Sequence, residues 1–253
     1  MSSSPVSVLV DPGERIGRNR LLSMLPEALR QEIEREGKVV ELVSGETLFR
    51  SGEDIGATLF PFTPAMISLV VEVDDKRSVE VATIGQEGAI GGIVSCGDLP
   101  AYTHAEVQVG GRGLSVPMNV VERLKRQDRT VRDLFCRYAD YLLAQVMQSV
   151  ACNAFHPIEA RAARWLLTAQ DRAGDELELT QSALAALLGV QRTSVNAVAP
   201  QLQDEGLIRY RRGMVSVLDR EELLHRSCDC YQRVESHFSK VLGGDSAWMD
   251  KCE

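Results

Sequence analysis

The spacing of apolar residues changes along the chain and divides it into a helical start, a β-rich middle and a helical end. Between residues 21 and 36 apolar positions recur at helical steps, and Pro26 and Gly37 mark where a helix begins and ends. From residue 38 to about 118, short apolar runs alternate with Gly, Asp and Ser turns, which is typical of a β-sandwich or barrel-like roll. From about Val120 the helical period returns.

The β-rich part predicts a series of short strands. They lie within residues 38–54, 57–62, 65–73, 78–85, 104–111 and 113–118. Pro61 and Pro64 border the run around Phe60. Because proline cannot donate a hydrogen bond to a strand ladder, we expect this run to be an edge or irregular strand.

Residues 128–154 predict one long helix with an apolar stripe at steps of three and four residues. Such a stripe packs either on the roll of its own chain or against a second copy of the chain. Charged residues such as Arg132 and Asp140 lie off the stripe, which favours a two-fold seam between two chains. The predicted seam residues are Val131, Leu134, Phe135, Tyr138, Leu142, Gln145, Val146 and Ser149.

Residues 179–204 have the pattern of two short helices joined by a glycine turn. Thr180 is a good N-cap for the first helix, and Gly189 permits the positive φ that a tight turn requires. Val195, Val198 and Leu202 then form the inward face of a second helix. This is the pattern of a helix-turn-helix, whose second helix enters the major groove of DNA.

A basic β-hairpin is predicted directly after the second helix. Arg209, Arg211 and Arg212 surround Tyr210, and Gly213 makes the turn. Such a wing suits contacts with phosphates. The expected DNA contacts of the whole unit are Thr180, Gln181, Gln191, Arg192, Thr193, Ser194, Asn196, Arg209, Arg211 and Arg212.

The net charge of the chain limits where DNA can bind. The chain of 253 residues has a formal net charge of -8, so it should not bind nucleic acid indiscriminately, and an anion site must be a local basic patch. No stretch reaches the length of a membrane span, and the first residues lack the pattern of a secretory signal. Six scattered cysteines suit free thiols in a reducing cytoplasm. They are Cys96, Cys136, Cys152, Cys228, Cys230 and Cys252.

The order of these parts resembles the Crp/Fnr family of bacterial transcription regulators over nearly the whole chain. The motifs are the turns SGE at 44–46 and SGED at 51–54, and LQDEGLIRYRRG at 202–213. The resemblance implies an α+β fold with an N-terminal β-roll of the cyclic-nucleotide-binding-like jelly-roll type, a long dimerisation helix and a C-terminal winged helix-turn-helix. The expected parts are a flexible tail (1–20), the sensor roll (21–127), the dimerisation helix (128–154), the DNA-binding domain (155–220) and a helical tail (221–253).

The resemblance further implies a cytoplasmic homodimer on a palindromic operator, with RNA polymerase as a partner. By position, Arg192 takes the place of an arginine that reads guanine, and Gln191 that of the N-cap residue. Thr193 and Ala197 stand where many members have an acidic reader and a second arginine, so we expect a different operator. Pro200 falls inside the recognition helix, where we expect a kink or a 3₁₀ turn.

The sensor roll departs from the members that bind cyclic AMP. Gly91 matches their Gly-Glu pair, but Gly92 replaces the glutamate, and Ala101 or Tyr102 before Thr103 replaces the phosphate-binding arginine. A phosphate without a guanidinium partner is poorly compensated when it is buried. We therefore expect no cyclic AMP binding. A different small effector would contact Gly91, Gly92, Tyr102 and Thr103.

No cofactor or metal is expected. The first cysteine is Cys96, which argues against the N-terminal iron–sulfur group of oxygen-sensing members, and haem ligation by His104 or Cys96 is disfavoured. A metal or redox role for the tail residues is a second possibility, but their spacing fits no zinc pattern, and buried thiols are favoured. These tail residues are His225, Cys228, Cys230 and His237.

No catalytic constellation is present in the sequence, so we do not expect an enzyme. The alternative to a DNA-binding regulator is a ligand- or redox-sensing interaction module that docks a helical partner and has no DNA contact. The wing arginines distinguish the two, because a partner-docking module does not need a guanidinium cluster beside a face of small polar residues.

Overall fold

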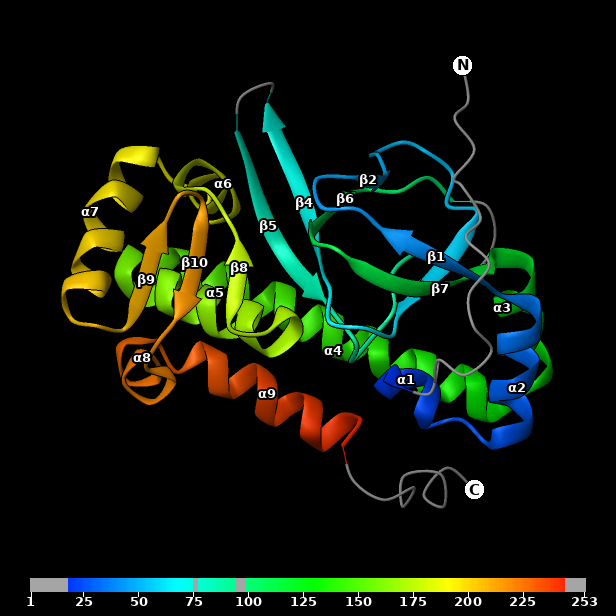
Figure 1. Cartoon of the computed structure of the whole chain (residues 1–253). Coiled ribbons are helices and arrows are strands. Elements are labelled where there is room, and N and C mark those ends of the chain that lie inside the picture. The colour runs from blue at the N-terminus through cyan, green and yellow to red at the C-terminus, as the bar shows by residue number, and fades with distance from the viewer. Residues whose placement is uncertain (1–17, 75–76, 94–98, 244–253) are drawn as a thin grey trace.

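The computed structural model describes residues 18–74, 77–93 and 99–243. An N-terminal β-roll and a C-terminal domain of helices with a small sheet lie on one long central helix (Figure 1). Residues 1–17 of the expected tail, Cys96, and the last ten residues with Trp248 lie outside the described residues. No helix in the described part of the chain is long and apolar enough to cross a membrane.

The roll is built from two antiparallel sheets that enclose a core. One sheet has the strand order β1-β7-β3, and the other has the order β2-β6-β4-β5. Their bounds are β1 Lys38–Leu42, β2 Thr47–Phe49, β3 Ala57–Pro61, β4 Met66–Asp74, β5 Arg77–Ile84, β6 His104–Val109 and β7 Gly111–Pro117. The predicted strands are thereby confirmed, and β3, which ends at Pro61, is an edge strand as expected.

Helices from both ends of the chain and from its middle pack against the roll. They are α1 Arg20–Ser23, α2 Glu27–Glu36, α3 Met118–Gln127, α4 Arg129–Phe155 and α9 Cys230–Val241. Apolar residues from all of them join one buried cluster, in which Phe135 of α4 meets Phe60 of β3 edge to face with ring centroids 6.3 Å apart. The long helix therefore belongs to the core of its own chain.

This packing corrects the predicted dimer seam. Val131, Leu134, Phe135 and Tyr138 are at most 1 % exposed and lie against the roll. Gln145 and Ser149 are also buried, and Leu142 and Val146 are half-buried. The stripe can be buried because Tyr138 and Gln145 form hydrogen bonds with backbone groups of the roll. The spacing of apolar residues alone does not predict these bonds.

Gln145 and Tyr138 show how this works. The Gln145 side chain accepts a hydrogen bond from the N–H of Thr83 and donates one to its carbonyl, both at 3.3 Å. The amide thus takes the place of a neighbouring strand's backbone. Thr83 lies on β5, the edge of the four-stranded sheet. The Tyr138 hydroxyl likewise accepts from the N–H of Ala89 and donates to its carbonyl, both at 2.9 Å.

The C-terminal domain begins at Pro157, after α4. It contains α5 Ile158–Ala173, β8 Glu176–Glu178, α6 Gln181–Leu187, α7 Arg192–Asp204, β9 Ile208–Arg211, β10 Met214–Val217 and α8 Arg220–Arg226. Its strands form a sheet of order β8-β10-β9, and its apolar residues form a second core, which Met66 of β4 joins from the roll. The expected break at 155–157 is confirmed, because α4 ends at Phe155.

A stability test follows from the double hydrogen bond of Tyr138. Replacing Tyr138 by phenylalanine keeps the ring but leaves the buried N–H and carbonyl of Ala89 without a partner. We expect Tyr138→Phe to lower the free energy of unfolding by about 1–3 kcal/mol, measured by urea denaturation. Tyr102→Phe is the matched control, because Tyr102 is 84 % exposed. Equal stability of the two variants would contradict this assignment.

Candidate DNA-binding interface and its links to the roll

The helix-turn-helix is formed by α6 and α7. The Thr180 side chain caps α6 by accepting from the N–H of Ala183 at 3.1 Å, and Gly189 has a φ of 63° in the turn, so both predictions are confirmed. Val195, Ala199 and Leu202 are the buried residues of α7. The helix continues as an α-helix through Pro200 to Asp204, so of the two expectations at Pro200 the 3₁₀ turn is not observed.

The buried face of α7 leaves the opposite face open. Gln191 is the N-cap residue, and Arg192, Thr193, Asn196 and Ala197 are exposed. Ser194 and Gln181 are half-buried, and Thr180 is exposed with its hydroxyl committed to the α6 cap. The structure therefore brings the predicted major-groove residues to one open surface at the N-terminus of α7.

The wing is a tight hairpin of β9 and β10. Met214 pairs with Arg211, so only Arg212 and Gly213 lie in the turn, and both have a positive φ, 52° and 81°. This is the backbone of a type I′ turn, which matches the twist of paired strands. Sequence analysis predicted the glycine but not the left-handed arginine beside it.

The arginines of this domain fall into two groups. Arg192, Arg209, Arg211 and Arg212 are exposed, and none of them has an ion-pair partner within the described residues. Arg226 instead contacts Glu205 at 2.7 Å and Glu159 at 3.4 Å. Between Leu179 and Gly213 the only acids are Asp204 and Glu205, so one of the two is already neutralised by Arg226. The four remaining guanidinium groups are available to an external anion.

The roll contains a cavity of about 300 Å³. Apolar residues such as Leu59 and Ile90 share its lining with four acidic residues, and no basic side chain of the described residues lines it. The acidic residues are Glu41, Glu46, Glu53 and Asp54. An anionic ligand in this cavity would meet negative charge without a compensating cation.

The predicted effector residues do not line this cavity. Gly91 and Gly92 form a turn next to it, with φ values of 94° and 60°. Tyr102 is 84 % exposed and Thr103 is half-buried. His104, considered for haem, lies 3.5 Å from the carboxylate of Glu72.

A buried ion pair joins α5 of the C-terminal domain to the roll. Arg172 contacts Glu87 at 2.6 Å and donates to the Tyr141 hydroxyl at 3.3 Å and to the carbonyl of Thr83 at 3.5 Å. Its side chain is 4 % exposed. Burial alone would lower the pKa of Arg172, but Glu87 and Tyr141 reverse that effect, and the net direction is upward.

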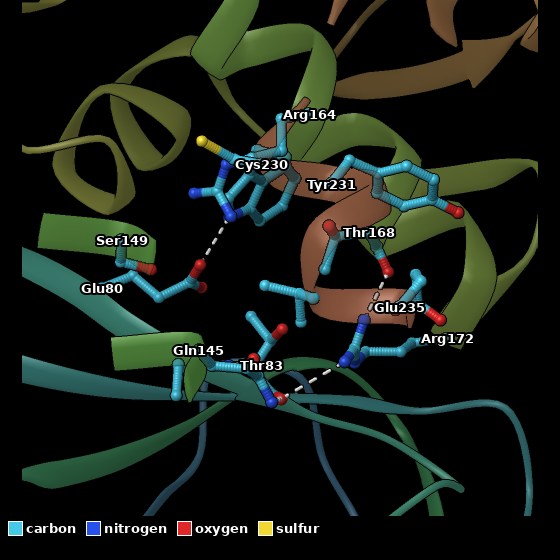
Figure 2. Close-up of a pocket in the computed structure, with 13 residues that line it drawn as sticks. Glu80, Thr83, Gln145, Ser149, Arg164, Thr168, Arg172, Cys230, Tyr231 and Glu235 are labelled. Carbon is cyan, nitrogen blue, oxygen red and sulfur yellow. Dashed lines mark hydrogen bonds between the residues drawn. The ribbon is translucent and has the colours of Figure 1, made fainter. Parts of the chain in front are cut away.

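Glu80 lies in the same small pocket between β5 and the helices (Figure 2). Its carboxylate accepts from the indole N–H of Trp165 at 2.9 Å and from the Ser68 hydroxyl. Burial raises the pKa of Glu80 to about 7, although these hydrogen bonds and Arg164 oppose the rise. Glu80 therefore titrates near neutral pH at the contact between the two domains.

The tail residues are arranged differently from the expected set. His225 pairs with Glu222 at 3.2 Å and His237 with Asp140 at 2.8 Å. Cys228 and Cys230 are buried as predicted, but they meet two residues from the end of α4, Cys152 and His156. Sequence analysis missed this grouping, although Cys152 and His156 are spaced four residues apart and so share one helix face.

The comparisons with known proteins agree with this architecture. Residues 160–226 match the family model of the Crp-like helix-turn-helix domain. No curated protein sequence is significantly similar to the chain. Many solved structures share its fold at low sequence identity, and three examples follow.

FixK2 from Bradyrhizobium japonicum has a TM-score of 0.65 at 15% identity, covering 76% of this chain and 98% of its own. A protein from Eubacterium rectale assigned to the Crp/Fnr family of transcriptional regulators has a TM-score of 0.64 at 16% identity, covering 84% and 97%. The c-di-GMP responsive global regulator CLP from Xanthomonas campestris has a TM-score of 0.62 at 17% identity, covering 77% and 100%. The TM-scores establish a common fold.

The fold and the open face of α7 define a DNA-binding transcription regulator with a helix-turn-helix. The resemblance to the Crp/Fnr family is confirmed, through the Crp-like domain of residues 160–226 and a fold shared with Crp/Fnr structures along most of the chain.

Glu80 predicts a pH dependence of stability. Because its folded pKa is raised, the native state binds a proton between about pH 4.5 and 7 that the unfolded state releases. Stability should therefore fall as pH rises through this window. We expect Glu80→Gln to flatten the slope and to be more stable than the unmodified chain at pH 8 by about 2 kcal/mol, allowing for partial solvent access. Urea denaturation across the window measures this.

Glu41→Gln on the exposed part of β1 is the matched control and should retain the slope of the unmodified chain. A slope that is the same in all three proteins would show that Glu80 does not titrate in this range.

Proposed function

We propose that this chain acts in the cytoplasm as a homodimer that binds a palindromic operator in a sequence-specific manner and does not respond to cyclic AMP. The observation that carries the proposal is the set of four arginines on α7 and the wing that have no ion-pair partner among the residues the structure describes. They are exposed in a chain whose net charge is -8. Such a local cation patch restricts polyanion binding to one face of the molecule.

The two parts of this patch have different chemistry. Arg192 stands at the first position of α7, from where a guanidinium reaches the edge of a guanine in the major groove. Asn196 follows one helical turn later on the same open face and suits an adenine or phosphate contact. Arg209, Arg211 and Arg212 on the wing suit phosphates, which fix the register of the protein on the duplex.

A second stripe on α4 supports the homodimer. Leu143, Met147 and Val150 are 51%, 61% and 65% exposed, and Ala154 is exposed as well. They follow one another at steps of four, three and four residues, which is the spacing of a coiled-coil seam. A second copy of α4 is the partner that satisfies such a repeat, and it replaces the seam expected from sequence.

The same helix connects pairing to DNA contact. α4 ends at Phe155, and α5 begins three residues later as the first helix of the DNA-binding domain. The geometry of the paired helices therefore sets the distance between two copies of α7. A signal in the roll would act by changing that geometry.

Independence from cyclic AMP rests on the acidic cavity. Glu41, Glu46, Glu53 and Asp54 line it, and a cyclic phosphate requires a cationic partner when it is buried. An effector of this cavity would be neutral or cationic.

Two arginine variants test the assignment of base and phosphate contacts. The probes are duplexes that the unmodified protein selects from a random-sequence library. Arg192→Ala should weaken the selected site by about 1–3 kcal/mol and relax preference at one position of each half-site. Arg211→Gln should weaken all duplexes alike and reduce the salt slope by about one. Both effects are measured by fluorescence anisotropy across salt concentrations.

Arg129→Gln at the far end of α4 is the charge-matched control and should change neither quantity. A uniform loss across sequences in Arg192→Ala would remove the base-reading role. Failure of the unmodified protein to bind any duplex at low salt would favour the alternative of a partner-docking module.

The dimer is tested by a matched pair of valine substitutions. Val150→Glu places a carboxylate on the exposed α4 stripe, where it would face its own copy, and we expect a monomer. Val43→Glu changes a valine of similar exposure, 57%, in the turn after β1, and should remain dimeric. Sedimentation velocity gives the molecular mass of each. A dimeric Val150→Glu would exclude this stripe as the interface.

A further inference from the structure

The end of α4, the loop between α8 and α9, and the first residue of α9 bring together four side chains of types that ligate metals. They are Cys152, His156, Cys228 and Cys230, and one ligand atom from each lies within 4.8 Å of all the others. Cys152 is 0% exposed, Cys230 1% and Cys228 8%, and His156 is half-buried. Buried thiols gathered from segments 76 residues apart are not explained by the roll or by the DNA-binding face.

Two of the separations between ligand atoms match the edges of a small tetrahedron, and the others are at most 4.8 Å. Zinc binds sulfur at about 2.3 Å and imidazole nitrogen at about 2.0–2.1 Å, so ligands at tetrahedral angles lie roughly 3.5–3.8 Å apart. Here Cys152 Sγ lies 3.5 Å from Cys228 Sγ, and Cys230 Sγ lies 3.4 Å from His156 Nδ1. One ion would be admitted if the longer separations closed by up to about one ångström, which small side-chain rotations can supply.

We propose that Cys152, His156, Cys228 and Cys230 form a four-coordinate Cys₃His site for a single thiophilic divalent cation, with Zn²⁺ as the fitting ion. Three thiolates and an imidazole are soft or intermediate ligands, which select Zn²⁺ over Mg²⁺ or Ca²⁺. The four ligands leave no open position, so the site is structural rather than catalytic.

Hydrogen-bond donors and a guanidinium lie beside the ligands. Gln148 donates from Nε2 to Cys230 Sγ at 3.0 Å, and the backbone N–H of Cys230 donates to the Cys228 sulfur. Arg164 adds positive charge beside Cys152. A zinc ion with three thiolates has roughly one net negative charge, which this guanidinium offsets.

The position of the site gives it a mechanical role. Cys152 and His156 occupy the last turn of α4 and its C-cap, and Cys228 and Cys230 follow the wing and α8. An ion would therefore link the pairing helix directly to the far side of the DNA-binding domain and fix their relative orientation. The effect on operator binding rests on the proposed function, whereas the binding of the ion does not.

The test measures metal content in the full-length protein without an affinity tag, purified with reductant and without chelator. We expect about one zinc per chain by mass spectrometry of metals. Co²⁺ added to the metal-free protein should give the visible absorption of a tetrahedral site and thiolate charge-transfer bands. Cys228→Ser and His156→Asn should lose both signals, whereas Cys136→Ser, on an exposed residue of α4, should keep them.

His156→Asn changes a half-buried residue, and its circular dichroism spectrum verifies that it is folded. Zinc below about a tenth of an ion per chain in the folded unmodified protein would overturn the site. Equal metal content in Cys228→Ser and Cys136→Ser would do the same. A disulfide between Cys152 and Cys228 in place of bound metal, found by mass spectrometry, would also overturn it.

Operator binding separates this inference from the proposed function. Removal of zinc by a chelator should weaken binding to the selected duplexes by about tenfold or more, and added Zn²⁺ should restore it. Unchanged affinity would overturn the orienting role of the ion. A protein that binds zinc but no duplex would instead overturn the proposed function and leave the metal site standing.

Discussion

The arrangement of the two domains depends on the edge strand β5, which no further strand covers, and on the buried guanidinium of Arg172 beside it. β5 ends the four-stranded sheet, and the N–H and carbonyl of Thr83 on it would be unsatisfied under a covering helix. Gln145 pairs with both, and Arg172 reaches the same carbonyl while it neutralises Glu87. Removal of the guanidinium would leave the half-buried Glu87 carboxylate with the backbone N–H of Gly85 but without a cation. The contact between α5 and the roll therefore depends on this ion pair, which few alternative packings can satisfy.

Much of the fold could be predicted from the sequence because local chemistry decides it. Thr180 can cap α6 and Gly189 can take a positive φ in any context, and alternating apolar residues specify strands with little help from their surroundings. The face that α4 turns inward could not be predicted. Tyr138 and Gln145 are amphipathic, and only the position of the roll decides whether their polar atoms meet a backbone or a second chain.

The candidate sites show the same division. The open face of α7 follows from helical periodicity, so Arg192 and Asn196 could be placed from sequence. The cysteine cluster could not be predicted from sequence. Motif spacing relates residues that are close in the sequence, whereas Cys152 and Cys228 are 76 residues apart. The cavity of the roll also differs from expectation, since its acidic residues come from the β1–β2 region and the loop before β3 rather than from the turn at Gly91 and Gly92.

Trp165 has a consequence of a different kind. The chain contains two tryptophans, at positions 165 and 248, and the indole N–H of Trp165 donates to Glu80 across the boundary between α5 and β5. Indole emission depends on the polarity of its surroundings and on nearby charge. Trp165 is thus a natural optical probe at the contact between the roll and the C-terminal domain, and a separation of the two can be followed in solution without attaching a dye.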